Sequence, residues 1–383
     1  MIIKNGLVFL PEEGFVKKDI QMKDGKILKI SDSILNDQGV KEYDASGQYV
    51  MPGMIDAHSH IGLFNEAMRW EGEDGNEGSD PVTADMNAMD AINPFDESFE
   101  EALRGGVTTA CTGPGSANVI GGSFATISLF GKIVDQMVIQ YPAAMKCAFG
   151  ENPKGWYGQS DNKAPMTRMG VGALLRESLI KAKNYKNKKE EAESKEEVFE
   201  IDPKLEALLP VLNKEIPLKA HAHRADDICT AIRIAKEFDV LLTLEHCTEG
   251  HMIADYIAEN KLCAMVGPTF GSRTKIELKN ISFDTARILT EKGIKVSIIT
   301  DHPVIPQGSL NMCAALAMKA GLPEKEALKA VTINPAQVLG IDHLKGELRE
   351  SLDADVVIWD KHPLDLQAKT ERVYVLGQEV FGR

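Results

Sequence analysis

The chain has 383 residues, of which 43% are hydrophobic and 26% are charged, and its formal net charge is −14. This is an ordinary globular composition, and the length is sufficient to bury a sizeable core. Acidic charge repels nucleic acid, no apolar run reaches the length of a membrane helix, and the N-terminus lacks a signal-peptide pattern. We therefore expect neither nucleic acid nor a membrane as a partner.

The cysteine pattern bears on the cellular compartment. None of the six cysteines has CxxC spacing, and most lie inside apolar segments: Cys111, Cys147, Cys229, Cys247, Cys263 and Cys313. Buried free thiols of this kind are typical of proteins in a reducing compartment. We therefore expect the protein to be cytoplasmic.

The two ends of the chain are predicted to form short strands. The first fifty residues contain three such segments, separated by turn residues such as Lys23-Asp24-Gly25. The last forty residues contain two more, ELRESLDADVVIWD and ERVYVLGQEVF. Because apolar runs bounded by turn residues are typical of β-structure, both ends are predicted to be small all-β units.

The middle of the chain alternates predicted strands with predicted helices. The strands cover residues 105–113, 143–152, 216–223, 240–247, 262–268 and 294–301, and helices among them cover 225–238, 251–260 and 283–293. Repeated strand–helix units predict a parallel sheet, and short apolar strands are typical of a sheet covered on both faces. An open doubly wound sheet and a closed barrel both fit this pattern. The length of the middle, roughly 290 residues, favours a (β/α)8 barrel with insertions.

Two segments interrupt the alternation. Residues Lys181 to Glu200 are rich in Lys and Glu, which predicts a solvated helix with ion pairs four residues apart, and binding through this segment is the minor alternative. Residues 65–95 form a long insert after the first barrel strand. An insert of this length is either a cover over an active site or a solvated acidic loop, and both interpretations stay open.

Side chains that bind metals stand at the ends of the predicted barrel strands. His58 and His60 share one face of the first strand with Asp56, because residues two apart on a strand point the same way. Four later strands end in similar residues: Glu151; His221 and His223; Glu245 and His246; Asp301 and His302. A lone histidine pair is usually structural, and a lone aspartate after a strand is usually a helix cap. Their joint placement at one pole of a barrel instead predicts a metal site.

At these residues the sequence resembles the amidohydrolase superfamily, in its imidazolonepropionase-related branch. The stretches that carry the resemblance are GQYVMPGMIDAHSH, GGVTT, AHAH, LEHC, TDHP, VTINPAQVLGI and GELRESLDADVVIWD, so that it covers nearly the whole chain. It implies a distorted (β/α)8 TIM barrel over residues 51–344 and a small β-sandwich built from residues 1–50 and 345–383. It also implies metal-dependent hydrolysis at the carboxyl ends of the barrel strands.

The resemblance assigns ligands to the metal. His58 and His60 come from the first strand, His246 from the sixth and Asp301 from the eighth. Asp56 has no ligand counterpart and is expected to orient or support its neighbours. Imidazoles combined with carboxylates suit Zn²⁺ best, with Fe²⁺, Mn²⁺, Co²⁺ or Ni²⁺ as alternatives.

Two ligand positions leave alternatives open. On the fifth strand His221 matches the ligand and His223 is then a nearby or substrate-binding residue, although the two could exchange. Members with two ions carry a bridging carboxylated lysine, or occasionally a glutamate, after the third or fourth strand. We assign this position to Glu151, because Lys154 comes too late, and expect one or two ions, with two favoured.

The expected chemistry is hydrolysis by hydroxide formed on the metal. Asp301 is predicted to take the water proton and deliver it to the leaving nitrogen, and His246 or His223 to stabilise the oxyanion. Arg224 and Arg273 are candidates for clamping a substrate carboxylate, and Trp70 for lining the pocket. For the two arginines a surface or structural role is at least as favoured, and Trp70 has packing of the insert as its alternative.

The leading function is hydrolysis of a carbon–nitrogen bond in a small cyclic amide, N-acyl amino acid or dipeptide-like substrate. Deamination of a heterocycle is the alternative, but the superfamily's deaminases carry a Glu three residues after the fifth-strand histidine, where this chain has Arg224. The chain lacks the residue expected after the fifth strand for imidazolonepropionase activity, and it lacks the motif expected after the sixth strand for sugar-phosphate deacetylation. A catalytically silent scaffold is disfavoured because every expected ligand position is filled. A homo-oligomer is compatible with the sequence.

Overall fold

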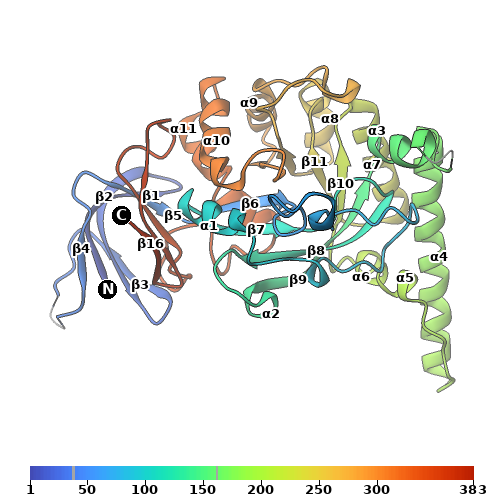
Figure 1. The fold of residues 1–383 in the computed structure, drawn as a ribbon, viewed down its shortest axis with the longest axis horizontal. Coiled ribbons are helices and arrows are strands. Elements are labelled where there is room, and N and C mark those ends of the chain that lie inside the picture. The colour runs from blue at the N-terminus through green and yellow to red at the C-terminus, as the bar shows by residue number, and fades with distance from the viewer. Residues whose placement is uncertain (37–38, 161–162) are drawn as a thin grey trace.

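The computed structural model describes residues 1–36, 39–160 and 163–383, and its strands form two sheets (Figure 1). Sheet A collects strands from both ends of the chain, and sheet B is a nearly closed barrel formed by the middle. Figure 1 shows both chain termini in the region of sheet A, at one end of the molecule, with the barrel beside it. The predicted fold class, a distorted (β/α)8 barrel with a β unit from both termini, is confirmed.

Sheet A has eight strands. They are β1 (Ile2–Leu10), β2 (Gly14–Lys23), β3 (Lys26–Ser31), β4 (Glu42–Asp44), β5 (Tyr49–Pro52), β14 (Val356–Trp359), β15 (Thr370–Val375) and β16 (Gln378–Gly382). Their order is β16-β15-β14-β5-β1-β2-β3, with β4 beside β1. The predicted turn between β2 and β3 places Asp24 and Gly25 at φ 51° and 78°, as a tight hairpin requires.

The junction between sheet A and the barrel lies at Asp355. Its carboxylate accepts hydrogen bonds from Lys345 at 2.8 Å and from Thr108 of the barrel at 3.1 Å, and its carbonyl accepts one from Gly53 at 3.0 Å. Strand β5 pairs with β1 and β14, so sheet A continues to Pro52 rather than stopping at residue 50. The two units are therefore joined by buried polar contacts as well as by the chain.

Sheet B also has eight strands, and they follow the chain order. They are β6 (Met54–Ser59), β7 (Val107–Thr112), β8 (Ile120–Ser128), β9 (Val138–Ala148), β10 (Leu218–Ala222), β11 (Leu242–His246), β12 (Ala264–Val266) and β13 (Val296–Ile298). The first and last strands meet just beyond β13, where Asp301 N donates to His58 O at 3.3 Å and His60 N donates to His302 O at 2.9 Å. This closure brings the first strand's histidines to Asp301.

The prediction of an entirely parallel barrel is wrong at β8. This strand runs antiparallel to both β7 and β9. Only residues 113–119 connect β7 to β8, which is too short for the helical crossover that parallel neighbours need. The loop 113–119 therefore stays at the pole where β6 ends, and it contributes Gly113 and Ser116 to the site.

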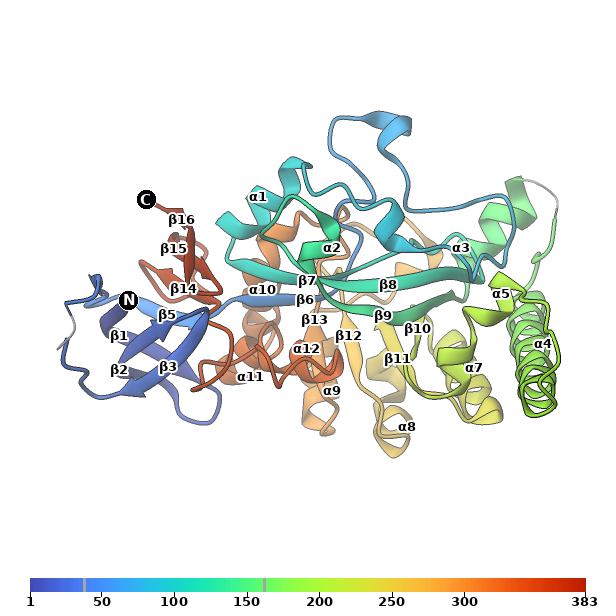
Figure 2. The same ribbon diagram turned by 90° about the horizontal axis from the view of Figure 1, so that it is seen from below.

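Helices cover the outside of the barrel (Figures 1 and 2). They are α1 (Glu97–Arg104), α2 (Val134–Met137), α3 (Glu151–Pro153), α4 (Arg168–Ser194), α5 (Pro203–Glu206), α6 (Leu209–Leu212), α7 (Ala225–Phe238), α8 (Ala254–Glu259), α9 (Asp284–Glu291), α10 (Leu310–Lys319), α11 (Glu324–Lys329) and α12 (Ile333–Val338). Helix α7 is typical, since it buries Ile228, Ile232 and Ala235 in the barrel core and leaves its polar side outward.

Helix α4 extends beyond the barrel at the end opposite sheet A (Figure 1). The predicted charged helix is present as far as Ser194, and its ion pairs four residues apart include Glu177–Lys181 at 2.6 Å. Its first half packs on the barrel through Leu175 and Leu179. Among the described residues no helix has both the length and the apolar character to cross a membrane.

Candidate metal centre

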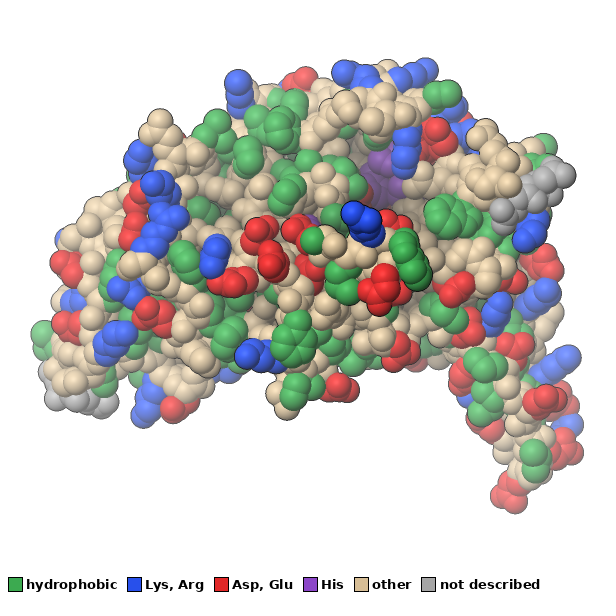
Figure 3. Space-filling model, in the orientation of Figure 1, with side chains coloured by type: hydrophobic (Ala, Val, Ile, Leu, Met, Phe, Trp, Pro, Cys, Tyr) green, Lys and Arg blue, Asp and Glu red, His purple; other side chains and the backbone are tan. Residues whose placement is uncertain are grey.

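A cavity of about 530 Å³ opens at the carboxyl ends of the barrel strands. Figure 3 shows histidine side chains inside a hollow on this face. The cavity is lined by His60, His221, His223 and Asp301, and also by Phe64 and Asn76 from the end of the first strand and the long insert. The insert therefore takes part in the cavity wall, as the cover interpretation predicts.

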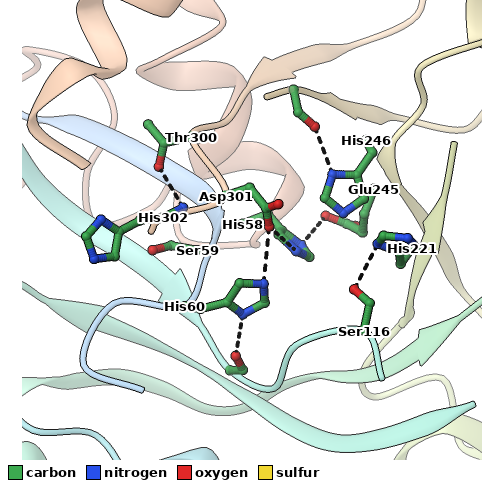
Figure 4. Close-up of polar contacts among 12 residues, drawn as sticks. His58, Ser59, His60, Ser116, His221, Glu245, His246, Thr300, Asp301 and His302 are labelled. Atoms are coloured by element: carbon green, nitrogen blue, oxygen red, sulfur yellow. Dashed lines mark hydrogen bonds and ion pairs between the residues drawn. The ribbon is translucent and has the colours of Figure 1, made fainter. Parts of the chain in front are cut away.

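The first cluster of metal-competent side chains consists of His58, His60 and Asp301. Asp301 Oδ1 lies 3.1 Å from His60 Nε2 and 3.5 Å from His58 Nε2 (Figure 4). The two histidines come from the end of β6 and Asp301 follows β13, so barrel closure alone assembles the group. All three were predicted as ligands, and the structure brings them together.

The hydrogen bond of His60 bears on how this cluster could hold a cation. His60 Nδ1 lies 2.6 Å from the carbonyl oxygen of Gly113. A carbonyl only accepts hydrogen bonds, so Nδ1 carries the ring proton and Nε2 faces Asp301 with a bare lone pair. Asp301 Oδ1 is buried, and within the described ranges no hydrogen-bond donor of suitable geometry faces it. Two acceptors 3.1 Å apart repel each other unless a cation lies against them.

The second cluster consists of His221, His223 and His246. His246 Nδ1 lies 2.8 Å from Gly267 O, His221 Nδ1 lies 2.8 Å from Ser116 Oγ, and His223 Nδ1 lies 2.7 Å from Thr248 Oγ1. The buried Nε2 atom of His246 has no hydrogen-bond partner in the part of the chain that the structure describes. Hydrogen bonds at Nδ1 that leave Nε2 for an ion are typical of metal-binding histidines. His221 and His223 both belong to this cluster, so the structure does not force a choice between them.

Burial keeps these imidazoles neutral, which is the form that binds metals. It lowers the pKa values of His58, His221 and His246 well below the usual range, and it lowers the pKa of His223 to about 4. For Asp301 burial acts to raise the pKa, but the neighbouring side chains of His246, His60 and Lys146 outweigh it, so the pKa is lowered. The site therefore offers neutral nitrogens around an ionised carboxylate.

The structure does not bring Glu151 into either cluster, and it places Lys146 there instead. Glu151 lies beyond the end of β9, and its Oε2 accepts a hydrogen bond from the backbone N of Glu277 at 3.3 Å. Lys146, inside β9, is completely buried, and its Nζ lies 3.3 Å from His58 Nε2. Burial lowers the pKa of Lys146 to about 8. The sequence signal for Lys146 was a lysine in the middle of an apolar strand.

Buried charged residues next to His58 Nδ1 orient the His58 ring. Glu245 Oε2 lies 2.8 Å from His58 Nδ1 and 3.0 Å from Lys219 Nζ, and Lys219 also donates to Ala57 O at 2.8 Å. Glu245 and Lys219 are 0% and 1% exposed, so the pair is fully removed from water. Carboxylates that hold a metal-binding histidine in this way fix the orientation of its ring.

Asp56 supports the same strand, as expected. Its carboxylate accepts hydrogen bonds from His58 N, from Gln307 Nε2, and from the backbone N and hydroxyl of Thr300. It thus ties β6 to the segment after β13 and has no part in either metal-competent cluster.

The predicted substrate contacts do not reach the cavity wall. Arg224 forms a bidentate ion pair with Asp226 at 2.9 and 2.8 Å, because the two are neighbours at the start of α7. Arg273 donates to backbone carbonyls of its own loop, and Trp70 is 82% exposed. Within the described part of the chain, the single lysine or arginine that lines the cavity is Lys275.

A barrel with histidine and aspartate clusters at the carboxyl ends of its strands defines the class of metal-dependent hydrolases that act on carbon–nitrogen bonds. The chain belongs to the amidohydrolase family, since the model of that family matches residues 49–380.

Relatives agree with this assignment. Amidohydrolase tasK of Hapsidospora irregularis is 26% identical over 95% of this chain, which spans only 40% of that relative's length. A solved structure of an amidohydrolase from Thermotoga maritima MSB8 has 43% identity and a TM-score of 0.97, with 100% of both chains covered. A prolidase complexed with N-methylphosphonate-L-proline is similar in fold, with a TM-score of 0.61 at 16% identity over 100% of this chain and 99% of that one.

Proposed function

We propose that the protein is a metal-dependent amidohydrolase that cleaves a carbon–nitrogen bond of a small cyclic amide, N-acyl amino acid or dipeptide-like compound. One observation carries the proposal: His60 Nε2 and Asp301 Oδ1 face each other as two acceptors 3.1 Å apart in the wall of the cavity. His60 and Asp301 would hold a divalent ion there, and the chemistry it would supply is a lower pKa for water, from about 15.7 towards 7, and polarisation of a substrate carbonyl.

The side chains divide the remaining work. Asp301, kept ionised by its surroundings, accepts the proton of the attacking water on its carboxylate and delivers it to the leaving nitrogen. His58 and His60 hold their Nε2 atoms towards the reaction centre because Glu245 and Gly113 O fix the opposite ring nitrogens. His246 has no proton on Nε2, because its Nδ1 donates to Gly267 O, so we assign it to metal binding rather than to the oxyanion.

We assign the bridging position to Lys146 in place of Glu151. Its low pKa leaves a substantial fraction of the amine neutral at pH 7 to 8, and a neutral amine attacks carbon dioxide to form a carbamate with release of one proton. A carbamate there would turn the buried cation beside His58 into an anionic oxygen ligand. This supports two ions, one at each cluster, with Zn²⁺ preferred for its nitrogen and oxygen ligands.

We propose that the substrate carries a carboxylate. Lys275 Nζ is half-exposed at the cavity, donates to Asn152 Oδ1 at 2.6 Å and lies 4.0 Å from Glu277 Oε1. Phe64, Phe270 and Val304 supply apolar wall around the same space. A compound with an apolar portion and a carboxylate fits this combination, and N-acyl amino acids and dipeptides have both.

The competing functions are separated by particular positions. A deaminase would need an acid where this chain has Arg224, which is paired with Asp226 outside the cavity. A silent scaffold would have lost ligands, but both clusters are complete. Membership of the imidazolonepropionase-related branch rests on the sequence motifs quoted above. The free cysteines of the described chain support a cytoplasmic location. Formation of a homo-oligomer stays a prediction.

The test is metal analysis followed by a substrate screen. Metal-replete protein is assayed with N-acyl amino acids, dipeptides and cyclic amides, and Asp301→Asn is assayed beside it. The variant should keep bound metal and lose turnover by roughly 10²–10⁴-fold. Unchanged turnover in the metal-loaded variant contradicts the role of Asp301, and ammonia release from a purine or pyrimidine favours the deaminase alternative.

A further inference from the structure

Glu277 is a buried carboxylate for which neither the fold nor the chemistry above gives a purpose. It lies in η5 (Ile276–Leu278), on the loop that follows β12. Residues 270–276 are all exposed, yet the Glu277 that follows them is only 1% exposed. An ionised carboxylate withdrawn from water is costly unless its oxygens are satisfied, so its surroundings need an explanation.

Its two oxygens have different environments. Oε2 accepts a hydrogen bond from the backbone N of Glu151 at 3.1 Å, in a reciprocal pair with the bond from Glu277 N to Glu151 Oε2. Oε1 is buried and has no hydrogen-bond partner among the described residues. Lys275 Nζ lies 4.0 Å from Oε1, which is an ion-pair distance but too long for a hydrogen bond. The free oxygen is therefore directed elsewhere.

Oε1 faces the second histidine cluster. It lies 3.8 Å from His221 Nε2 and 3.7 Å from His223 Nε2. These separations are too long for hydrogen bonds. They are close to the spacing of ligands around one tetrahedral ion, which is roughly 3.4 Å for metal–ligand bonds of about 2.0–2.1 Å. A cation at the centre would contact all three atoms, of which His221 Nε2 has only Asn152 Nδ2 at 3.4 Å as a neighbouring donor among the described residues.

We propose that Glu277 is a protein ligand, together with His221 and His223, of a divalent cation of the Zn²⁺ type. The proposal rests on the metal-dependent function proposed above and extends it. Imidazole nitrogens and a carboxylate oxygen are ligands that Zn²⁺ binds in proteins. The ion in the second cluster would then hold the loop after β12 against the barrel.

The proposal is tested by metal content rather than by turnover. Wild type, Glu277→Gln and Glu277→Ala are loaded with Zn²⁺, and the number of bound ions and the affinity of each are measured by elemental analysis and chelator competition. The matched control is Glu151→Gln, which alters the partner of Glu277 in the reciprocal pair but leaves its free oxygen. Both Glu277 variants should lose one ion, or bind it about 100-fold more weakly or worse, while the control keeps both.

A second measurement reports on the loop. Trypsin cleavage after Arg273 and Lys275, both exposed, should be slow in loaded wild type and in Glu151→Gln, and fast in loaded Glu277→Ala. If the Glu277 variants bind Zn²⁺ as wild type does, the inference is overturned while the hydrolase function stands. If wild type binds no divalent ion, both proposals fall. If Glu151→Gln loses the ion and the Glu277 variants keep it, Glu151 is the ligand instead.

Discussion

Lys146 determines how the first cluster is charged. Without modification it places a cation 3.3 Å from His58 Nε2, where a second positive ion would be repelled. As a carbamate it becomes an anionic ligand. We therefore predict that Lys146→Met lowers the metal content from two ions to one and reduces turnover at least 100-fold. Elemental analysis of protein loaded with Zn²⁺ and bicarbonate measures the effect.

The control for Lys146 is Lys154→Met. Lys154 follows the same strand, beyond Glu151, and was set aside on sequence grounds because of its late position. Its removal should leave the metal content and turnover as in wild type. Equal metal content in Lys146→Met and wild type would contradict the bridging role.

Lys275 determines substrate preference. We predict that Lys275→Met raises KM for N-acyl amino acids about 10-fold or more and changes kcat little, because a charge-assisted contact to a carboxylate away from the reacting bond is lost. The same substrates with the carboxylate converted to an amide should show no such change. Lys279→Met, on the same loop but outside the cavity wall, is the control. An equal loss with both substrate types would show that Lys275 supports the loop rather than the carboxylate.

The residues that sequence alone identified share one property, which is a metal-binding side chain at the end of an apolar strand. His58, His60 and Asp301 were found in this way. Glu277 lies in a loop with exposed neighbours, so no periodicity pointed to it. Lys146 was missed because a lysine within a strand is ordinarily exposed on one face, and only the closed barrel shows that this face points inward.

At the scale of elements, helix α4 allows the stability contribution of a buried apolar side chain to be compared with that of an exposed ion pair. Leu179 is 0% exposed in the barrel core, whereas the Glu177–Lys181 pair is more than half exposed. We predict that Leu179→Ala lowers the free energy of unfolding by about 2–5 kcal/mol and that Lys181→Ala lowers it by about 0.3–0.5 kcal/mol. Urea unfolding of the two variants measures the difference. A larger effect from Lys181→Ala would mean that the projecting half has a further contact.

Strand β8 is an element whose direction could not be predicted from the sequence. The segment Ile120–Ser128 is apolar enough for a barrel strand, but its direction depends on whether a helix precedes it. The short loop 113–119 determines the direction of β8. Its sequence, rich in Gly and Ser, is compatible with a tight turn as well as with a crossover. The helices α7, α8 and α9 were predictable because their apolar periodicity is strong and each follows a strand.

At the scale of the whole molecule, buried neutral histidines make the metal-free protein sensitive to acid. The pKa values of His223 and His302 are lowered to about 4 by burial, against about 6.5 in an unfolded chain. Between these values the unfolded state binds protons that the folded state does not, so stability falls as the pH falls from 6.5 to 4. Each histidine contributes about 3 kcal/mol to this loss. Urea unfolding of chelated protein at pH 7, 6 and 5 should show the decline, with a smaller slope for His302→Asn.

Removal of the metal should lower the stability of the whole barrel. The two clusters join residues from β6, β10, β11 and the segment after β13, so their lone pairs connect several parts of the barrel. An ion that binds only the folded state stabilises it by about 4 kcal/mol at a free concentration a thousand times its Kd. We therefore predict that chelation lowers Tm by several degrees and that Zn²⁺ restores it. The rise of Tm on adding Zn²⁺ should require intact ligands in both clusters. Asp301→Asn, which keeps its metal, should therefore recover Tm with Zn²⁺. A His58→Ala, His246→Ala double variant should not recover it. An unchanged Tm after complete removal of metal would show that protonation, rather than an ion, compensates the facing acceptors in the folded chain.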